Sequence, residues 1–74
     1  MIELVRYIVS NLVDNPDKIV IAQNGEIIKV TVDKQDMGKI IGRQGTIARS
    51  IKTIVRSAAN KQNLKVQVEI VDEL

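Results

Sequence analysis

Residues 38–45 of the chain are Gly-Lys-Ile-Ile-Gly-Arg-Gln-Gly. This stretch places Gly42 and Gly45 three residues apart, directly after a pair of isoleucines. Glycine adopts backbone conformations that are closed to other residues, and it lets a ligand approach the backbone without meeting a Cβ atom. The stretch therefore predicts a tight, exposed turn whose backbone is open to a partner molecule.

Helical character flanks this turn on both sides, with a short segment before it and a long one after it. In the long segment, apolar residues recur at about 100° per residue on the predicted core-facing side: Ile47, Ile51, Ile54, Val55 and Ala58. Arg49, Lys52 and Arg56 fall together on the opposite side, which predicts a cationic, solvent-facing stripe. Either Asp33 or Asp36 is placed to cap the short helix. Residues 34–60 are thus predicted to form a helix, a loop and a second helix.

The remaining segments predict one helix and three strands. Residues 1–17 carry apolar side chains at helical spacing as far as Asn15-Pro16, where proline disfavours the helical conformation of the residue before it. Residues 18–33 hold β-branched runs on either side of Asn24-Gly25, which is the strongest short-range hairpin signal. Residues 63–72 alternate apolar and polar side chains, and the inward-facing set is predicted to be Leu64, Val66, Val68 and Ile70.

This order of elements, αββααβ, predicts a single α+β domain that spans residues 1–74. The second strand alternates apolar and polar residues, so one face of the sheet is buried and the other is wet. Three helices are available to cover the buried face. Because a helical connection joins the second and third strands, they are expected to lie parallel, with the first strand antiparallel beside them. The fold class is therefore a three-stranded mixed sheet with three helices packed on one face.

Composition excludes several classes of function. The chain has 74 residues, with no cysteine and no histidine, so it lacks a thiolate metal site and the commonest general base. Between residues 34 and 61 there are seven Lys or Arg and one acidic residue, Asp36, which makes the middle of the chain locally basic. Asp14, Asp17, Asp33 and Asp36 are interpreted as residues of helix ends and turns rather than metal ligands. The absence of a long apolar run predicts a cytoplasmic protein. The absence of a Ser-His, Cys-His or GKS/GKT arrangement predicts that it is not an enzyme.

The loop has the features of a phosphate-binding backbone. Gly45 stands just before a helix, where free N–H groups and the helix dipole attract anions. Arg43 adds a formal positive charge, while Gln44 adds an exposed amide. Ile40 and Ile41 are adjacent and cannot both face inward on a helix, so one is expected in the core and the other in a ligand groove; the sequence leaves open which is which.

Gly42-Arg43-Gln44-Gly45 between two helices resembles the GXXG loop of the KH domain, which clamps four nucleotides of backbone. The order of elements is similar to the type II, bacterial arrangement of that domain. Residues 3–5, 12–17, 38–45 and 51–55 in combination resemble the KhpA family of stand-alone bacterial KH proteins. The sequence departs from the broader KH signature at Ala48, where a branched aliphatic residue is usual.

The resemblance implies an RNA chaperone or post-transcriptional regulator that binds single-stranded RNA with weak sequence selectivity. It also implies dimerisation, either with a second copy or with a larger KH-containing partner of the KhpB (Jag) type. No cofactor, metal, membrane or small-molecule substrate is expected. The residues expected to contact RNA are Lys39, Ile41, Gly42, Arg43, Gln44, Gly45, Thr46 and Arg49.

Two other classes of function stay open from the sequence. A protein-interaction module of KH shape is the main alternative, because the apolar stripe of the first helix, with Ile27 and Val71, provides material for a dimer face. A binder of double-stranded DNA fares less well, because Thr46, Ser50 and Ser57 offer few long side chains that could read bases.

Overall fold

The computed structural model describes residues 1–71, and the predicted order of elements is confirmed. The helices are α1 (Ile2–Ser10), α2 (Met37–Ile41) and α3 (Thr46–Lys61), and the strands are β1 (Val20–Asn24), β2 (Ile27–Thr31) and β3 (Gln67–Ile70). Short 3₁₀ turns join them: η1 (Pro16–Lys18), η2 (Lys34–Asp36) and η3 (Arg43–Gly45). Within the described residues, none of the helices has the length and hydrophobicity that a membrane-spanning segment requires.

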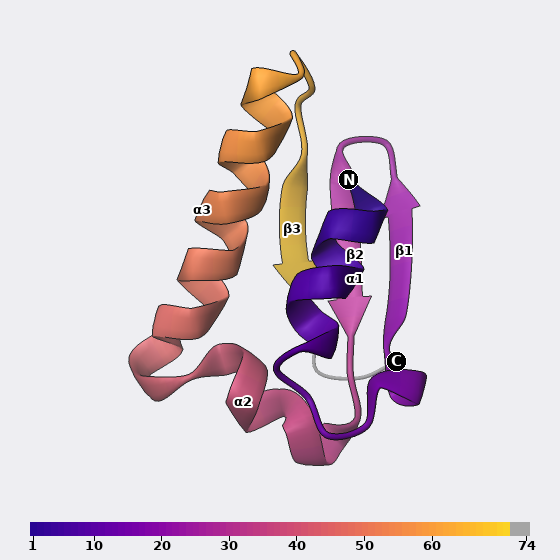
Figure 1. Cartoon of the computed structure of the whole chain (residues 1–74), viewed down its shortest axis with the longest axis vertical. Coiled ribbons are helices and arrows are strands. Elements are labelled where there is room, and N and C mark those ends of the chain that lie inside the picture. The colour runs from indigo at the N-terminus through magenta and orange to yellow at the C-terminus, as the bar shows by residue number, and fades with distance from the viewer. Residues whose placement is uncertain (72–74) are drawn as a thin grey trace.

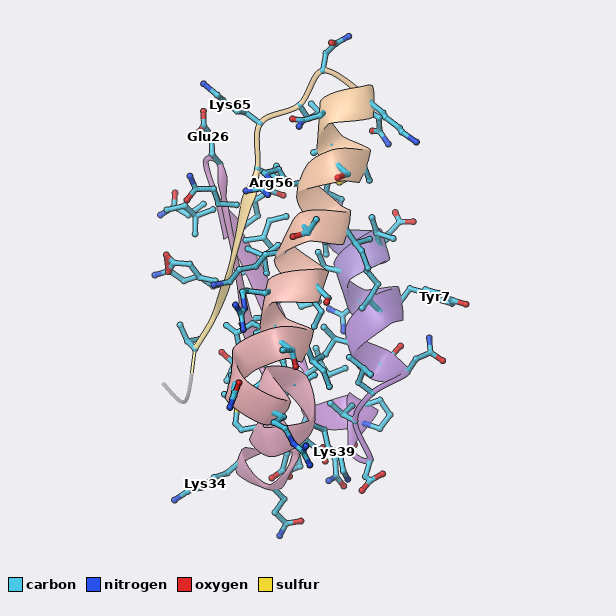
Figure 2. The ribbon with its side chains drawn as sticks, turned by 90° about the vertical axis from the view of Figure 1, so that its left-hand side faces the viewer. Tyr7, Glu26, Lys34, Lys39, Arg56 and Lys65 are labelled. Atoms are coloured by element: carbon cyan, nitrogen blue, oxygen red, sulfur yellow. The ribbon has the colours of Figure 1, made fainter. Side chains whose placement is uncertain are left out.

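The strands form one mixed sheet in the order β1-β2-β3. Strands β1 and β2 pair antiparallel across a hairpin in which Gly25 has a φ of 63°, a left-handed conformation that glycine adopts without steric cost. Strands β2 and β3 pair parallel, with α2 and α3 in the connection between them. All three helices lie on the same side of the sheet, as the two perpendicular views of Figure 1 and Figure 2 together show. The predicted fold class is therefore confirmed.

The core lies between this sheet and the helices. Side chains from every helix and from the central strand are fully buried there, and they include Val5, Val9, Ile28, Val30, Ile40 and Val55. Burying one such aliphatic side chain stabilises the fold by roughly 1.5–3 kcal/mol. The core thus fixes α2 and α3, the two helices that hold the loop, against the sheet.

Helix α1 is shorter than the predicted segment 1–17. It ends at Ser10, because the side chains of Ser10 and Asn11 both donate to the Tyr7 carbonyl at the helix end, at 3.1 and 2.7 Å. Polar side chains that bond to neighbouring backbone groups in this way compete with continued helix. The following turn brings Val13 into the core, and Pro16 starts η1 rather than ending the helix.

Two predicted core positions are exposed. On α3 the buried line is Ile51, Val55 and Ala59, whereas Ile54 is 50% exposed because it lies on the flank of that line. Leu64 was expected to face inward, but it is 45% exposed and precedes β3, which begins only at Gln67. Residue 72, the predicted end of this strand, lies outside the described residues.

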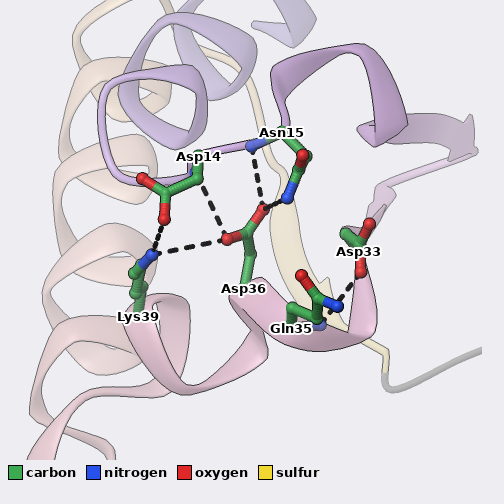
Figure 3. A network of polar contacts seen from close by, with 6 residues as sticks. All are labelled: Asp14, Asn15, Asp33, Gln35, Asp36 and Lys39. Atoms are coloured by element: carbon green, nitrogen blue, oxygen red, sulfur yellow. Dashed lines mark hydrogen bonds and ion pairs between the residues drawn. The ribbon is translucent and has the colours of Figure 1, made fainter.

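A polar network ties α2 to the connection that follows α1 (Figure 3). Asp36 is only 1% exposed, and its carboxylate accepts hydrogen bonds from the Asp14 and Asn15 backbone N–H groups, at 3.2 and 3.0 Å, and from the Asn15 amide at 3.2 Å. Lys39 forms an ion pair with Asp14 and approaches Asp36 at 3.6 Å. Of the two candidate caps, Asp33 is the one that acts as a cap, because its side chain accepts from the Gln35 N–H in η2. Asp36 instead joins two distant parts of the chain.

The network shifts two pKa values. Burial by itself raises the pKa of Asp36, but the N–H donors of Asp14 and Asn15 and the nearby Lys39 ammonium outweigh it, so the net pKa lies below 3.8. The hydrogen bond and charge of Asp14, with the charge of Asp36, raise the pKa of Lys39 above 10.5. Both shifts mean that folding favours the charged forms.

These directions predict how stability depends on pH. The contribution of ionised Asp36 to the free energy of unfolding is fully present above its ordinary pKa of 3.8. It is lost as the pH falls through the lower pKa of the folded state, because the unfolded chain takes up the proton first. The contribution of Lys39 is present below pH 10.5 and is lost as the pH rises through its raised value. We expect Asp36→Asn to flatten the acid limb of a plot of unfolding free energy against pH. The control Asp17→Asn, at an exposed carboxylate, should leave that limb in place.

Candidate nucleic-acid interface

In the loop between α2 and α3, residue 42 has a backbone conformation and surroundings that only glycine fits. There φ is 72° and ψ is −178°, a combination that is essentially restricted to glycine. A Cβ atom at this position would lie 2.5 Å from Cγ1 of Ile47, so the close packing of α3 against the loop also excludes a side chain. Gly42 is therefore a structural residue that sets the turn.

Gly45 has a different role from Gly42. Its φ of 76° and ψ of 13° are left-handed, but a Cβ atom built there would meet nothing within 4 Å. The space in front of Gly45 is open, at the N-terminus of the 16-residue helix α3. A ligand backbone can therefore approach the start of α3 closely, where the helix dipole favours negative charge.

The carbonyl groups of the loop are held by side chains from the first turn of α3. The Thr46 hydroxyl donates to the Arg43 carbonyl at 2.8 Å, and Nη2 of Arg49 donates to the Gln44 carbonyl at 2.9 Å. Among residues 1–71, no side-chain acceptor caps the N–H groups at the start of η3 or α3. The sequence predicted Thr46 and Arg49 as RNA contacts, but it gave no sign of their hydrogen bonds to the loop carbonyls.

The structure separates the two adjacent isoleucines. Ile40 is fully buried in the core, whereas Ile41 is 36% exposed. Ile41 lines a shallow cleft of about 510 Å³ together with Met37, Gly38, Gly42 and Ile70. This cleft lies beside the loop and is largely apolar, so Ile41 is the residue of the pair that a ligand can contact.

A second cleft of about 300 Å³ runs between α3 and the edge strand β3. Its walls are Lys52 and Arg56 from α3, Val66 just before β3, and residues 67–69 of β3, among them the acidic Glu69. Figure 2 shows Arg56 extending from α3 towards this strand. Lys52 and Arg56 face solvent as predicted, but they flank the core along the seam with β3 and do not lie opposite it. The spacing of Arg49, Lys52 and Arg56 in the sequence puts all three on one flank of α3. The sequence did not show that β3 is the element beside that flank.

The predicted site residues do not all lie together. Arg43 and Gln44 are exposed in the loop, and Gln44 adopts a left-handed conformation with φ 56° and ψ 28°. Lys39 lies on α2 in the ion pair with Asp14 and Asp36, so part of its charge is neutralised within the protein. The ligand-accessible surface is thus the loop, the Ile41 cleft and the α3–β3 seam. No cluster of potential metal ligands occurs among the described residues.

The sequence matches a known protein-family model. The model described as "KhpA/KhpB, KH domain" matches residues 2–70, which is nearly the whole chain. The chain belongs to this family. It therefore carries a KH domain, which is a binding module and not an enzyme fold.

Similar proteins of several bacteria share most of their length with this chain. RNA-binding protein KhpA of Clostridium perfringens is 45% identical over 96% of the chain and all of its own length. The protein of the same name from Borreliella burgdorferi is 43% identical over 96% of the chain and 92% of its own length. That of Chlamydia trachomatis is 42% identical over 99% of both. No solved structure matches the chain.

The two glycines should respond differently to alanine. Gly42→Ala should reduce the free energy of unfolding by about 3 kcal/mol or more, because it combines a glycine-only conformation with overpacking against Ile47. Gly45→Ala should cost only about 1 kcal/mol, which is the strain of a left-handed residue in open space. Urea unfolding of both variants checks this. Equal losses would contradict the assignment of a packing role to Gly42 alone.

Proposed function

We propose that this protein binds single-stranded RNA, with the phosphate backbone on the loop at residues 42–45 and the strand continuing along the α3–β3 seam. The observation that carries the proposal is the open approach to Gly45 at the start of α3, where no side chain caps the helix. Arg43 in the loop and Lys52 and Arg56 in the seam supply positive charge along this path. The relatives named RNA-binding protein KhpA support the choice of RNA as the ligand.

The cleft beside the loop offers bases an aliphatic surface. Met37, Ile41 and Ile70 line it, and the single aromatic residue, Tyr7, lies on α1 and points away from the body of the molecule (Figure 2). Aromatic stacking contributes about 1–3 kcal/mol per base where it occurs. Without it, affinity depends mainly on contacts to phosphate, which every sequence presents equally. This favours weak sequence selectivity and the role of an RNA chaperone or post-transcriptional regulator.

Replacing both exposed loop residues tests the RNA site. Arg43→Asp with Gln44→Asp should weaken binding of a single-stranded RNA by at least about tenfold, because a cation is lost and two carboxylates face the phosphates. The protein should stay folded, since both side chains are exposed. The readout is fluorescence anisotropy of a labelled oligonucleotide at low salt.

A charge-matched control is available in the same chain. Lys34 and Gln35 form an exposed basic–amide pair in the same order on η2, so Lys34→Asp with Gln35→Asp changes the net charge equally. This control should bind RNA much as the wild type does. Undiminished binding by the loop variant, or an equal loss in both variants, would contradict the loop assignment.

We further propose that the outer surface of α1 and α3 is the contact for a second KH domain, either another copy or that of a larger KhpB-type protein. The two helices pack against each other, and each exposes a large apolar side chain: Tyr7 is 70% exposed and Ile54 is 50% exposed. Apolar side chains exposed on adjacent elements are a common feature of association surfaces. Ile27 and Val71, the other candidates from the sequence, are both partly buried.

Ile54→Asp should dissociate such a dimer, because it would place a charge in an apolar contact. Light scattering would report the mass in solution of the wild type and the variant. Thr53→Asp, at the exposed neighbouring position, is the matched control and should retain the mass of the wild type. A monomeric wild type at micromolar concentration, or a dimer that survives Ile54→Asp, would contradict this surface.

A further inference from the structure

Arg49 makes a contact that a residue would not need if it only bound phosphate. Its Nη2 donates to the carbonyl of Gln44, five residues earlier in the chain, at 2.9 Å. This bond runs from the first turn of α3 back to the tip of the loop. It therefore links the rigid helix to the part of the chain that meets the ligand.

Gln44 is the residue of the loop that most needs such a link. Its φ of 56° and ψ of 28° are left-handed, and residues with a Cβ atom adopt this conformation at a cost. It stands between Gly42 and Gly45, whose backbones are themselves permissive. The Gly45 and Thr46 backbone N–H groups donate to the Gly42 and Arg43 carbonyls and hold part of this stretch, and two side-chain bonds add to that hold.

The bonds from Thr46 and Arg49 fix two consecutive peptide planes. Because the peptide unit is planar and trans, holding a carbonyl also sets the direction of the N–H on the other side of the same bond. Thr46 holds the Arg43 carbonyl and so orients the Gln44 N–H. Arg49 holds the Gln44 carbonyl and so orients the Gly45 N–H, which itself donates to the Gly42 carbonyl at 3.3 Å. The loop is thereby held in one shape before any ligand arrives.

We propose that Arg49 is a positioning residue for RNA binding: it holds the Gln44–Gly45 peptide in the conformation that accepts the phosphate backbone, and it acts on RNA through the loop. This inference rests on the proposed RNA site. Preorganisation of this kind raises affinity because the free protein has already lost the conformational freedom that binding would otherwise remove. Arg43 and Arg49 thus have different tasks despite carrying the same charge.

Salt dependence separates the two tasks. A side chain that neutralises a phosphate changes the slope of log K against log salt concentration by about 0.7 for a single strand. Arg43→Ala should therefore weaken binding and lower this slope. Arg49→Ala should weaken binding by a similar factor, on the order of tenfold for the loss of a charge-assisted bond, with the slope unchanged. Lys61→Ala removes an exposed cation at the far end of α3 and corrects for net charge.

A second measurement uses the free protein. Backbone ¹⁵N relaxation should show Gln44 and Gly45 as rigid in the wild type and in Lys61→Ala, with order parameters near 0.85, and as mobile in Arg49→Ala, with values falling towards about 0.6. A melting curve for each variant checks that the fold is retained, as expected for a residue whose side chain is exposed.

Each outcome decides the inference. A loss of affinity with an unchanged slope and a mobile loop supports it. A slope that falls as it does for Arg43→Ala, an unchanged affinity, or a loop that stays rigid in Arg49→Ala overturns it. If RNA binds elsewhere, the Arg43→Asp, Gln44→Asp variant binds as the wild type does. That result defeats the proposed site and the RNA role of Arg49 together, whereas a changed slope in Arg49→Ala defeats the positioning role alone.

Discussion

The contact between Gly42 and Ile47 is the constraint on which the rest of the site depends. Ile47 packs so closely on the backbone of Gly42 that no side chain fits between them, and the φ of 72° at Gly42 lets the chain turn within this space. The contact therefore determines where α3 begins relative to α2. The position of α3 in turn places Thr46 and Arg49 within reach of the loop carbonyls.

The opposite end of α2 has an anchor of another kind. The buried carboxylate of Asp36 satisfies two backbone N–H groups of the connection after α1, and Lys39 completes the network with Asp14 (Figure 3). Buried polar groups stabilise a fold only when they are fully partnered, and no buried side-chain polar atom among the described residues lacks a partner. Helix α2 is thus held by a polar network at its start, by Ile40 in the core and by the glycine contact at its end.

These constraints divide the loop region into a rigid part and an accessible part. Gly42, Ile47 and the two bonded carbonyls belong to the rigid part, while Arg43, Gln44 and the space before Gly45 remain exposed. The apolar cleft at Ile41 and the cationic seam at Arg56 extend the accessible surface along β3. An extended, flexible polyanion is the kind of ligand that such a narrow surface with separated apolar and cationic parts fits.

The order of elements, the mixed sheet and the position of the loop could all be predicted from the sequence. Hairpin residues, proline, β-branched runs and glycine spacing act through local conformational preference, and that information is carried by neighbouring residues. Three features needed the folded structure: Ile40 is buried and Ile41 exposed, Asp36 bonds across the chain, and Lys52 and Arg56 face β3. Periodicity gives the relative angle between side chains on one helix, but the identity of the element opposite each flank depends on packing between segments that are distant in the sequence.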